Sequence, residues 1–177
     1  MGMNAVLCTL SSARLAKIEA TPALIQELLE ARHDTKIPGL LDLGKTWDAL
    51  RIVIEGDRAE GPIADAIVAR SGRQLGPRMA YGRARVLDAR RVSEVAAALD
   101  ALPEGLVDAR YTALGAREVH GGWGKEVSVP GDPKYVRERA REGEIREKRE
   151  LSEMLARVRE LYRGAAAGGH AMLSAIV

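Results

Sequence analysis

Residues 151–177 read LSEMLARVRELYRGAAAGGHAMLSAIV, and this stretch holds the most regular hydrophobic pattern in the chain. Its apolar side chains recur three and four residues apart, the spacing of one helix face; they are Leu151, Met154, Leu155, Val158, Leu161 and Tyr162. Gly168 and Gly169 end this helix, and the apolar residues 171–177 follow as a predicted strand. A helix that feeds a strand is half of a crossover unit, so this stretch predicts an α/β fold.

The other end of the chain also carries an apolar run. Residues 3–10 precede Ser11 and Ser12, which are typical helix caps, and predict a buried strand. Apolar strands at both ends, with helices between them, favour a small mixed sheet covered by helices on both faces. A length of 177 residues suits one domain with a sizeable core. We therefore expect a single domain over 1–177, with a charged helical extension around 132–150.

Between these two strands the sequence predicts mainly helices. They are expected after Thr21-Pro22, over 45–56, 62–70 and 88–102, as short pieces within 103–119, and from Asp132-Pro133 onward. Glycine and proline make 33–39 and 72–82 predicted loops. Residues 84–87 are expected to be extended, and 125–129 alternate polar and apolar residues like an edge strand.

Composition restricts the class of protein. The chain is 46% hydrophobic and 29% charged, as globular proteins are, and its net charge of +2 indicates no dominant polyanionic partner. The single cysteine, Cys8, permits no internal disulfide. The N-terminus lacks a secretory pattern, and no apolar stretch reaches the roughly 20 residues that span a bilayer. These features predict a cytoplasmic protein with no membrane partner.

Several blocks of the sequence resemble one bacterial family. They are Met1-Gly2-Met3, the segment from Leu41-Asp42 through Lys45, Trp47 and Leu50 to Gly56, GRARVLDARRVSEVAAAL at 82–99, and the C-terminal LYRGAAAGGHAMLSAIV. In this order they are similar to the YfbM-like family, also known as domain of unknown function 1877. The resemblance implies a three-layer α/β sandwich and a bacterial origin, and it carries over no catalytic residue. The sequence departs from the family pattern at 119–123 and at 137–150.

The sharpest motif is GLLDLGKT at 39–46, which matches the P-loop pattern of nucleotide-binding proteins. In a P-loop, backbone amides cradle phosphates after a buried strand, but here the preceding residues 33–38 form a predicted polar loop. Three of the four variable positions are leucines, which favour a core over a phosphate-binding loop. The next acids after an apolar run, Glu55 and Asp57, follow too closely to leave room for the helix and second strand of a nucleotide-binding fold. The sequence therefore favours an ordinary helix start at Lys45.

Five residues are candidates for a ligand site: Trp47, Asp48, Arg51, His120 and Trp123. Asp48 and Arg51 share a helix face beside Trp47, and His120 and Trp123 lie in a glycine-rich loop. The alternative interpretation, which we favour for the first three, is a core tryptophan beside a surface ion pair.

Other reactive residues show no catalytic pattern. His33, His120 and His170 lack metal-ligand spacing, so neither a metal nor another cofactor is expected. His33-Asp34 and Glu118 with His120 could act as acid and base only if the fold joined them. Ser11, Ser12 and Ser71 lack a hydrolase elbow, and Cys8 lies in an apolar strand, where thiols are usually inert.

Charge is uneven along the chain. Residues 70–91 hold seven arginines and one acid, Asp88, with Tyr81 available for base stacking. We favour a solvated arginine-rich segment over nucleic-acid binding. Residues 137–150 mix six basic and five acidic side chains, partly at i,i+4 spacing, which favours a solvated helix.

Two classes of function stay open. The first is a non-enzymatic binding or interaction domain, such as a toxin-neutralising or accessory partner of another protein; homo-oligomerisation is compatible with it. The second is a small-molecule-binding protein or enzyme with a pocket near Trp47 and Trp123, since such pockets combine aromatic walls with few polar groups.

Overall fold

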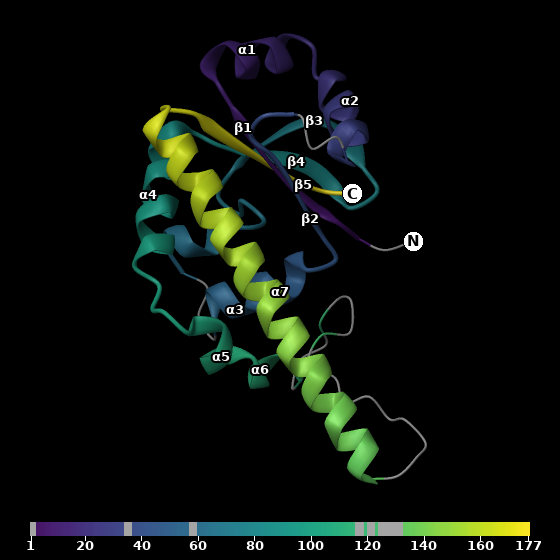
Figure 1. Cartoon of the computed structure of the whole chain (residues 1–177). Helices are drawn as coiled ribbons and strands as arrows, with labels where there is room; N and C mark the ends of the chain where they lie inside the picture. The colour runs from purple at the N-terminus through teal and green to yellow at the C-terminus, as the bar shows by residue number, and fades with distance from the viewer. Residues whose placement is uncertain (1–2, 34–36, 57–59, 116–118, 120–122, 124–132) are drawn as a thin grey trace.

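A five-stranded sheet forms the centre of the protein. The computed structural model describes residues 3–33, 37–56, 60–115, 119, 123 and 133–177. The strands are β1 (Ala5–Leu10), β2 (Leu40–Gly44), β3 (Arg73–Met79), β4 (Gly82–Leu87) and β5 (Ala171–Ile176), in the order β2-β1-β5-β4-β3. The strands predicted from the two ends of the sequence therefore pair with each other in the middle of the sheet (Figure 1).

All the strand pairings are antiparallel, so the expectation of a mixed sheet and a crossover unit is wrong. The reason lies in the connection from β4 to β5. It contains two long helices, α4 (Ala89–Asp100) and α7 (Pro133–Ala167), which run in opposite directions (Figure 1). The chain consequently returns to the end of the sheet that it left, and β5 runs antiparallel to β4, whereas a crossover would make the two strands parallel.

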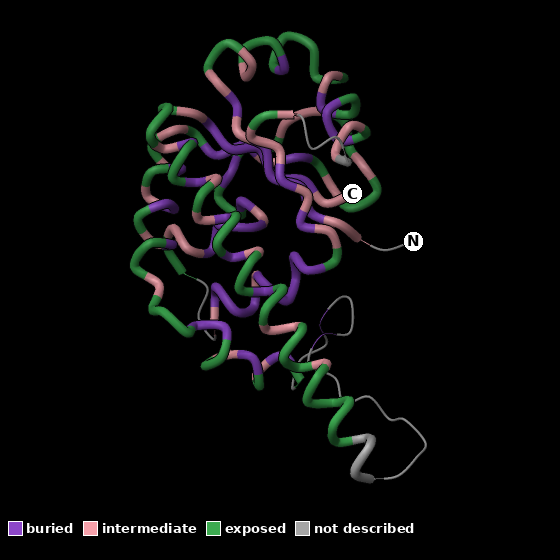
Figure 2. Tube along the Cα trace, in the orientation of Figure 1, coloured by how far each residue is buried: buried purple, intermediate pink, exposed green. Residues whose placement is uncertain are grey.

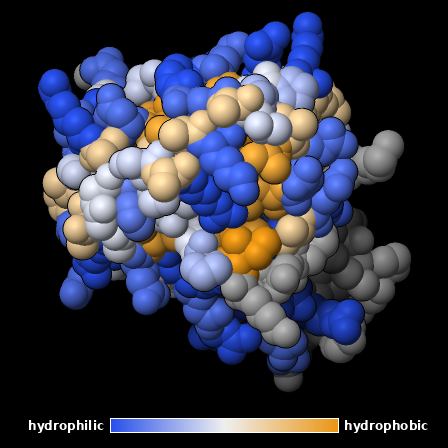
Figure 3. Space-filling model, turned by 90° about the horizontal axis from the view of Figure 1, so that it is seen from above, coloured by the Kyte–Doolittle hydropathy of each residue, from blue (hydrophilic) through white to orange (hydrophobic). Residues whose placement is uncertain are grey.

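Helices cover both faces of the sheet, as the three-layer sandwich requires. α1 (Ser12–Ala20) and α2 (Leu24–Glu30) lie on one face. The other face carries α3 (Trp47–Glu55), α4, α5 (Leu106–Arg110), α6 (Thr112–Gly115) and α7. The face seen from above carries many hydrophilic side chains around a smaller apolar area (Figure 3). None of the described helices is long and apolar enough to cross a membrane.

Strand alternation divides the core into two clusters. Successive side chains of a strand point to opposite faces, so Leu7 and Met172 pack toward α7, whereas Cys8 and Leu173 pack toward α1 and α2. All four side chains are fully buried. Sequestering both apolar faces from water is what stabilises the three layers.

Helix boundaries follow local signals where a polar cap is present. Ser11 accepts a hydrogen bond from the Arg14 amide (3.3 Å) at the start of α1, and Asp88 accepts one from the Arg91 amide (2.8 Å) at the start of α4. Thr21 does not cap α2, because that helix begins three residues later. The helix expected over 62–70 is only a 3-10 turn, η2 (Pro62–Asp65), and another such turn, η1 (Ala31–His33), follows α2.

Two strands lie where the sequence predicted otherwise. β3 occupies most of the expected loop at 72–82, and β2 was not predicted as a strand. β3 is an outer strand with a register shift between Leu75 and Met79, which is where a sheet tolerates Pro77. The edge strand predicted at 125–129 lies outside the described residues.

The two halves of α7 differ in environment. Leu151, Val158 and Tyr162 are fully buried, whereas Ile145 in the first half is 59% exposed. Figure 2 shows that the described residues of this first half are mainly exposed and extend away from the sheet. The apolar stripe of 151–162 therefore anchors the helix to the core.

Candidate functional site

Trp47 belongs to the core. It lies in the first turn of α3, is 7% exposed, and its indole Nε1 donates a hydrogen bond to the backbone oxygen of Met3 (3.1 Å). This bond satisfies the polar end of a ring that is otherwise buried among apolar side chains. Trp47 is not among the residues that line the nearby cleft.

Asp48 and Arg51 form the predicted pair, but the pair is part of a larger ion network. Arg51 Nη2 lies 2.7 Å from Asp48 Oδ1, and its Nη1 donates to Glu55 Oε2 (3.1 Å). Glu55 Oε2 also accepts a hydrogen bond from Arg70 Nη2 (2.7 Å). Burial raises the pKa of Glu55 above its usual range, although both arginines oppose the shift. Glu55, four residues after Arg51, was not predicted as a member of this network, and neither was Arg70, which only folding brings close.

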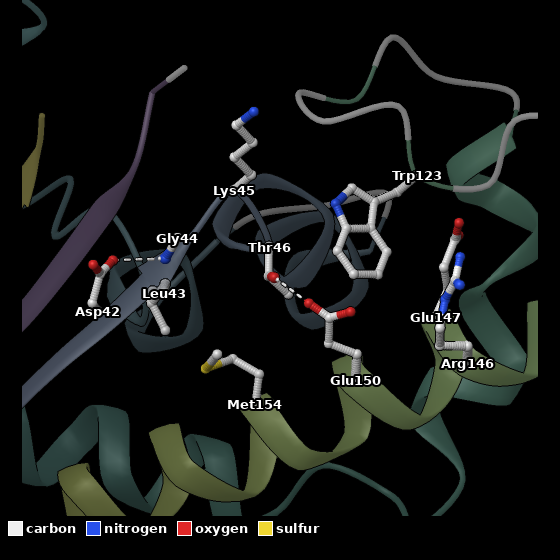
Figure 4. A pocket seen from close by; sticks show the side chains of 10 residues that line it. All are labelled: Asp42, Leu43, Gly44, Lys45, Thr46, Trp123, Arg146, Glu147, Glu150 and Met154. Atoms are coloured by element: carbon white, nitrogen blue, oxygen red, sulfur yellow. Dashed lines mark hydrogen bonds between the residues drawn. The ribbon is translucent and has the colours of Figure 1, made fainter. Parts of the chain in front are cut away.

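A cleft of about 630 Å³ opens between the end of β2, the residues just before α3, and α7 (Figure 4). Its lining consists of Asp42, Leu43, Gly44, Lys45, Thr46, Trp123, Arg146, Glu147, Glu150 and Met154. Trp123 faces Thr46 and Glu150 across the cleft, and Lys45 extends from its rim (Figure 4). Of the two predicted tryptophans, only Trp123, which is 9% exposed, forms a wall of this cleft.

The carboxylates of the cleft bind its own framework. Thr46 Oγ1 donates to Glu150 Oε1 (3.1 Å), and the Gly44 amide donates to Asp42 Oδ1 (2.8 Å). The Tyr111 hydroxyl donates to Glu147 Oε2 (2.5 Å). Two causes raise the pKa of Tyr111: burial, which is the larger, and the hydrogen bond to the Glu147 carboxylate. The Thr46–Glu150 bond joins α7 to the β2–α3 corner, and the Tyr111–Glu147 bond joins α7 to the junction of α5 and α6.

A second, separate cavity of about 500 Å³ lies further along the same strand and helix. It is lined by Thr9, Gly39, Leu40, Leu41, Arg157, Glu160, Leu161, Gly164, Ala165 and His170. Leu41 of this cavity and Asp42 of the first cleft are neighbours on β2. The two cavities together are named the β2–α7 track below.

The remaining sequence candidates separate. His170 lies in the second cavity and Trp123 in the first, whereas His120 lies outside the described residues. In the segment that matches the P-loop pattern, residues 40–44 form β2, so this backbone is extended and cannot wrap around a phosphate. No group of histidine, cysteine or acidic side chains within the described part of the chain could hold a metal ion.

The nucleophile candidates are held in structural roles. Burial raises the pKa of the Cys8 thiol to about 11, against the opposing charge of Arg14, so Cys8 carries little thiolate at neutral pH. Ser71 binds the buried carboxylate of Asp65 through its amide (2.7 Å) and its hydroxyl (2.6 Å). Arg91 Nε donates to the same carboxylate (2.7 Å). This cluster pins the turn before β3, and the sequence carried no signal for it.

The fold places this chain among the three-layer α/β proteins with an antiparallel sheet. The family described as "Domain of unknown function (DUF1877)" matches residues 1–175, and the chain belongs to that family. The crystal structure of YfbM, a protein of unknown function from Escherichia coli, is similar in fold. It has a TM-score of 0.61 and 19% sequence identity, and the alignment covers 98% of this chain and 99% of that one. A search of curated proteins finds no significant match.

Proposed function

We propose that the protein is a non-enzymatic binding domain, and that the β2–α7 track receives an extended segment of a partner protein. The observation that carries this proposal is that the two cavities lie one after the other along the same strand and the same helix. A small-molecule site would need only one of them.

The length of the track suits a peptide. On α7 its lining runs from Arg146 to Ala165, which corresponds to roughly 28 Å at 1.5 Å per helical residue. An extended segment of about eight residues spans the same distance at about 3.5 Å each. The track therefore matches a short stretch of polypeptide in length.

The lining of the track also suits a mixed sequence. Apolar side chains occur in both cavities, with Met154 and Trp123 in the first and Leu161 in the second. Both cavities also carry cations and carboxylates, such as Arg157 and Glu160 in the second. Such a surface favours a segment with two apolar anchors and charges of both signs, since interfaces combine apolar centres with polar rims.

The main alternative is a small molecule in the first cleft alone. Its volume of about 630 Å³ is within the range of ligand pockets, and Trp123 supplies an aromatic wall. This alternative predicts that changes in the second cavity have no effect on binding.

The experiment uses random 12-residue peptides displayed on phage and selected on the full chain. Enriched peptides are labelled, and their Kd is measured by fluorescence anisotropy. Gly164→Arg is the blocking variant for the second cavity. Gly164 lines this cavity, and a Cβ added there would meet no atom within 4 Å beyond the local helix backbone, so the new side chain fits without disturbing α7. Lys45→Glu reverses the exposed cation at the rim of the first. Ala156→Arg is the matched control, because Ala156 is exposed on α7 outside the track.

We expect both track variants to weaken binding at least about tenfold, because Gly164→Arg blocks apolar contacts and Lys45→Glu replaces a cation with an anion at the rim. The control should bind like the original chain. Absence of enriched peptides, or binding that neither track variant changes, contradicts the proposal. Loss with Lys45→Glu alone also contradicts it and supports the small-molecule alternative.

The location of the protein and the kind of partner are also proposals. A cytoplasmic bacterial protein is supported by the composition and by the family, and cell fractionation tests it. The toxin-neutralising or accessory role and homo-oligomerisation stay predictions; light scattering of the purified chain tests the second.

A further inference from the structure

A small hollow of about 250 Å³ differs from the other cavities in charge. It is lined by Val68, Arg70, Tyr81, Arg83, Arg85, Ser174, Ala175 and Ile176. Three of these side chains are arginines and none is acidic. Each of the four larger or comparable cavities described for this chain includes at least one carboxylate.

Strand geometry brings these arginines together. Residues two apart on a strand share a face, so Arg83 and Arg85 project to the same side of β4. Ala84, between them, is buried in the cluster under α1 and α2 on the opposite side. Arg85 lies opposite Ser174 on β5, which places the hollow over the β4–β5 pair.

Two of the three arginines carry charge that no carboxylate among the described residues neutralises. Arg70 is paired with Glu55 at 2.7 Å. Arg85 Nη1 instead donates to the backbone oxygens of Arg70 (2.8 Å) and Gly72 (3.3 Å), which orient the guanidinium without cancelling its charge. Arg83 is exposed and forms no ion pair with a residue that the structure describes.

The other arginines of the segment are mostly neutralised. Arg73 pairs with Glu19, Arg90 with Glu94, and Arg91 with both Asp65 and Glu94. Binding a nucleic acid requires several unpaired cationic side chains that follow the phosphate backbone of the nucleic acid. Here the unopposed charge of 70–91 is concentrated mainly in one hollow, which suits a single anionic group.

The chemistry of the hollow selects the ligand. Guanidinium groups bind oxyanions with parallel hydrogen bonds, and a phosphate monoester carries about −1.5 to −2 charge at neutral pH, which matches two arginines. Tyr81, 45% exposed, stands at the edge of the hollow and offers an aromatic face. We propose that the hollow binds the phosphate group of a small phosphorylated molecule through Arg83 and Arg85, with a ring of that molecule against Tyr81.

The experiment is an NMR titration of the full, ¹⁵N-labelled chain with phenyl phosphate, inorganic phosphate and benzoate. We expect saturable shifts at residues 82–86 and 174–176. Arg83→Gln should weaken phenyl phosphate at least about tenfold, since it removes a charge-assisted contact. Arg78→Gln, an exposed arginine of the adjacent strand outside the hollow, is the matched control and should leave the affinity unchanged.

Tyr81→Ser should weaken phenyl phosphate but leave inorganic phosphate unchanged. The proposal is overturned if Arg78→Gln weakens binding as much as Arg83→Gln, because the binding would then be general attraction to positive charge. It is also overturned if benzoate binds as tightly as phenyl phosphate. Tighter binding of a 12-nucleotide single strand, sensitive to both arginine substitutions, would replace it with a nucleic-acid site.

Discussion

Substituting the buried carboxylate of Asp65 should destabilise the protein more than substituting any exposed acid. Asp65 is 1% exposed and accepts three hydrogen bonds, two from Ser71 and one from Arg91. The turn that it holds includes Ala69, whose φ of 45° is in the left-handed region that L residues rarely adopt. Without Asp65, the turn loses the side chain that keeps it in this conformation.

The expected loss follows from the groups left behind. Removing one partner of a buried ion pair costs about 3–5 kcal/mol. Arg91 is partly exposed and keeps a second carboxylate, Glu94, at 2.9 Å, so the lower end of this range applies. Asp65→Ala should therefore reduce the free energy of unfolding by about 3 kcal/mol, which lowers the Tm by about 6–12 °C for a chain of this length.

The assay is thermal and urea unfolding followed by circular dichroism. Asp65→Asn keeps one oxygen acceptor for Ser71 and should lose about half as much stability, roughly 1.5 kcal/mol. Glu94→Gln is the matched control, since it removes the less buried carboxylate partner of the same arginine, and its Tm should stay close to that of the original chain. An Asp65→Ala Tm within about 2 °C of the original would refute the reasoning.

The same carboxylate gives a pH dependence with a definite sign. Burial by itself raises the pKa of Asp65, but the hydrogen bonds from Ser71 and Arg91 outweigh it and hold the pKa below its usual value. Its contribution to stability is therefore fully present above the unfolded pKa of about 3.9 and is lost as the pH falls through the lower folded value. The stability gap between the original chain and Asp65→Asn should narrow below about pH 4.

Three further predictions test the fold and the excluded site. Trp47→Ala should cost about 3–5 kcal/mol in urea unfolding, because a buried ring is removed; an unchanged midpoint would revive a binding role for Trp47. Calorimetric titration with ATP and magnesium should give only heat of dilution, since β2 replaces the loop that a P-loop needs; micromolar binding that Lys45→Ala abolishes would contradict this. Backbone amides of 137–149 should exchange with deuterium much faster than those of 155–162, because only the second group lies on the buried stripe; equal protection would show that a partner covers the first.

The sequence alone predicted the elements whose signals are local. The apolar stripe of 151–162, the Asp88 cap of α4, and the apolar runs of β1 and β5 each depend on residues a few positions apart. Their types follow from periodicity and capping, which neighbouring residues determine. The family and its three-layer fold followed from the order of such blocks.

The candidate site was predicted only in part. Trp123 was singled out and lines the cleft, and the pair of Asp48 and Arg51 exists. Thr46 and Glu150, however, are 104 residues apart and meet only after α7 crosses the β2–α3 corner. Nothing in the local sequence around either residue encodes that contact.

The tertiary structure decided the weak strands and the direction of the sheet. β2 and β3 are the outer strands, and neither carries an unbroken apolar run. Pairing with β1 and β4, which is a nonlocal interaction, specifies them. The antiparallel direction of β5 depends on two helices in the preceding connection instead of one. Asp65 and Arg91 likewise acquire their roles from a contact across 26 residues. Local patterns determine which segments are helices and apolar strands, whereas burial and pairing between distant segments determine how those segments are arranged and which polar groups meet.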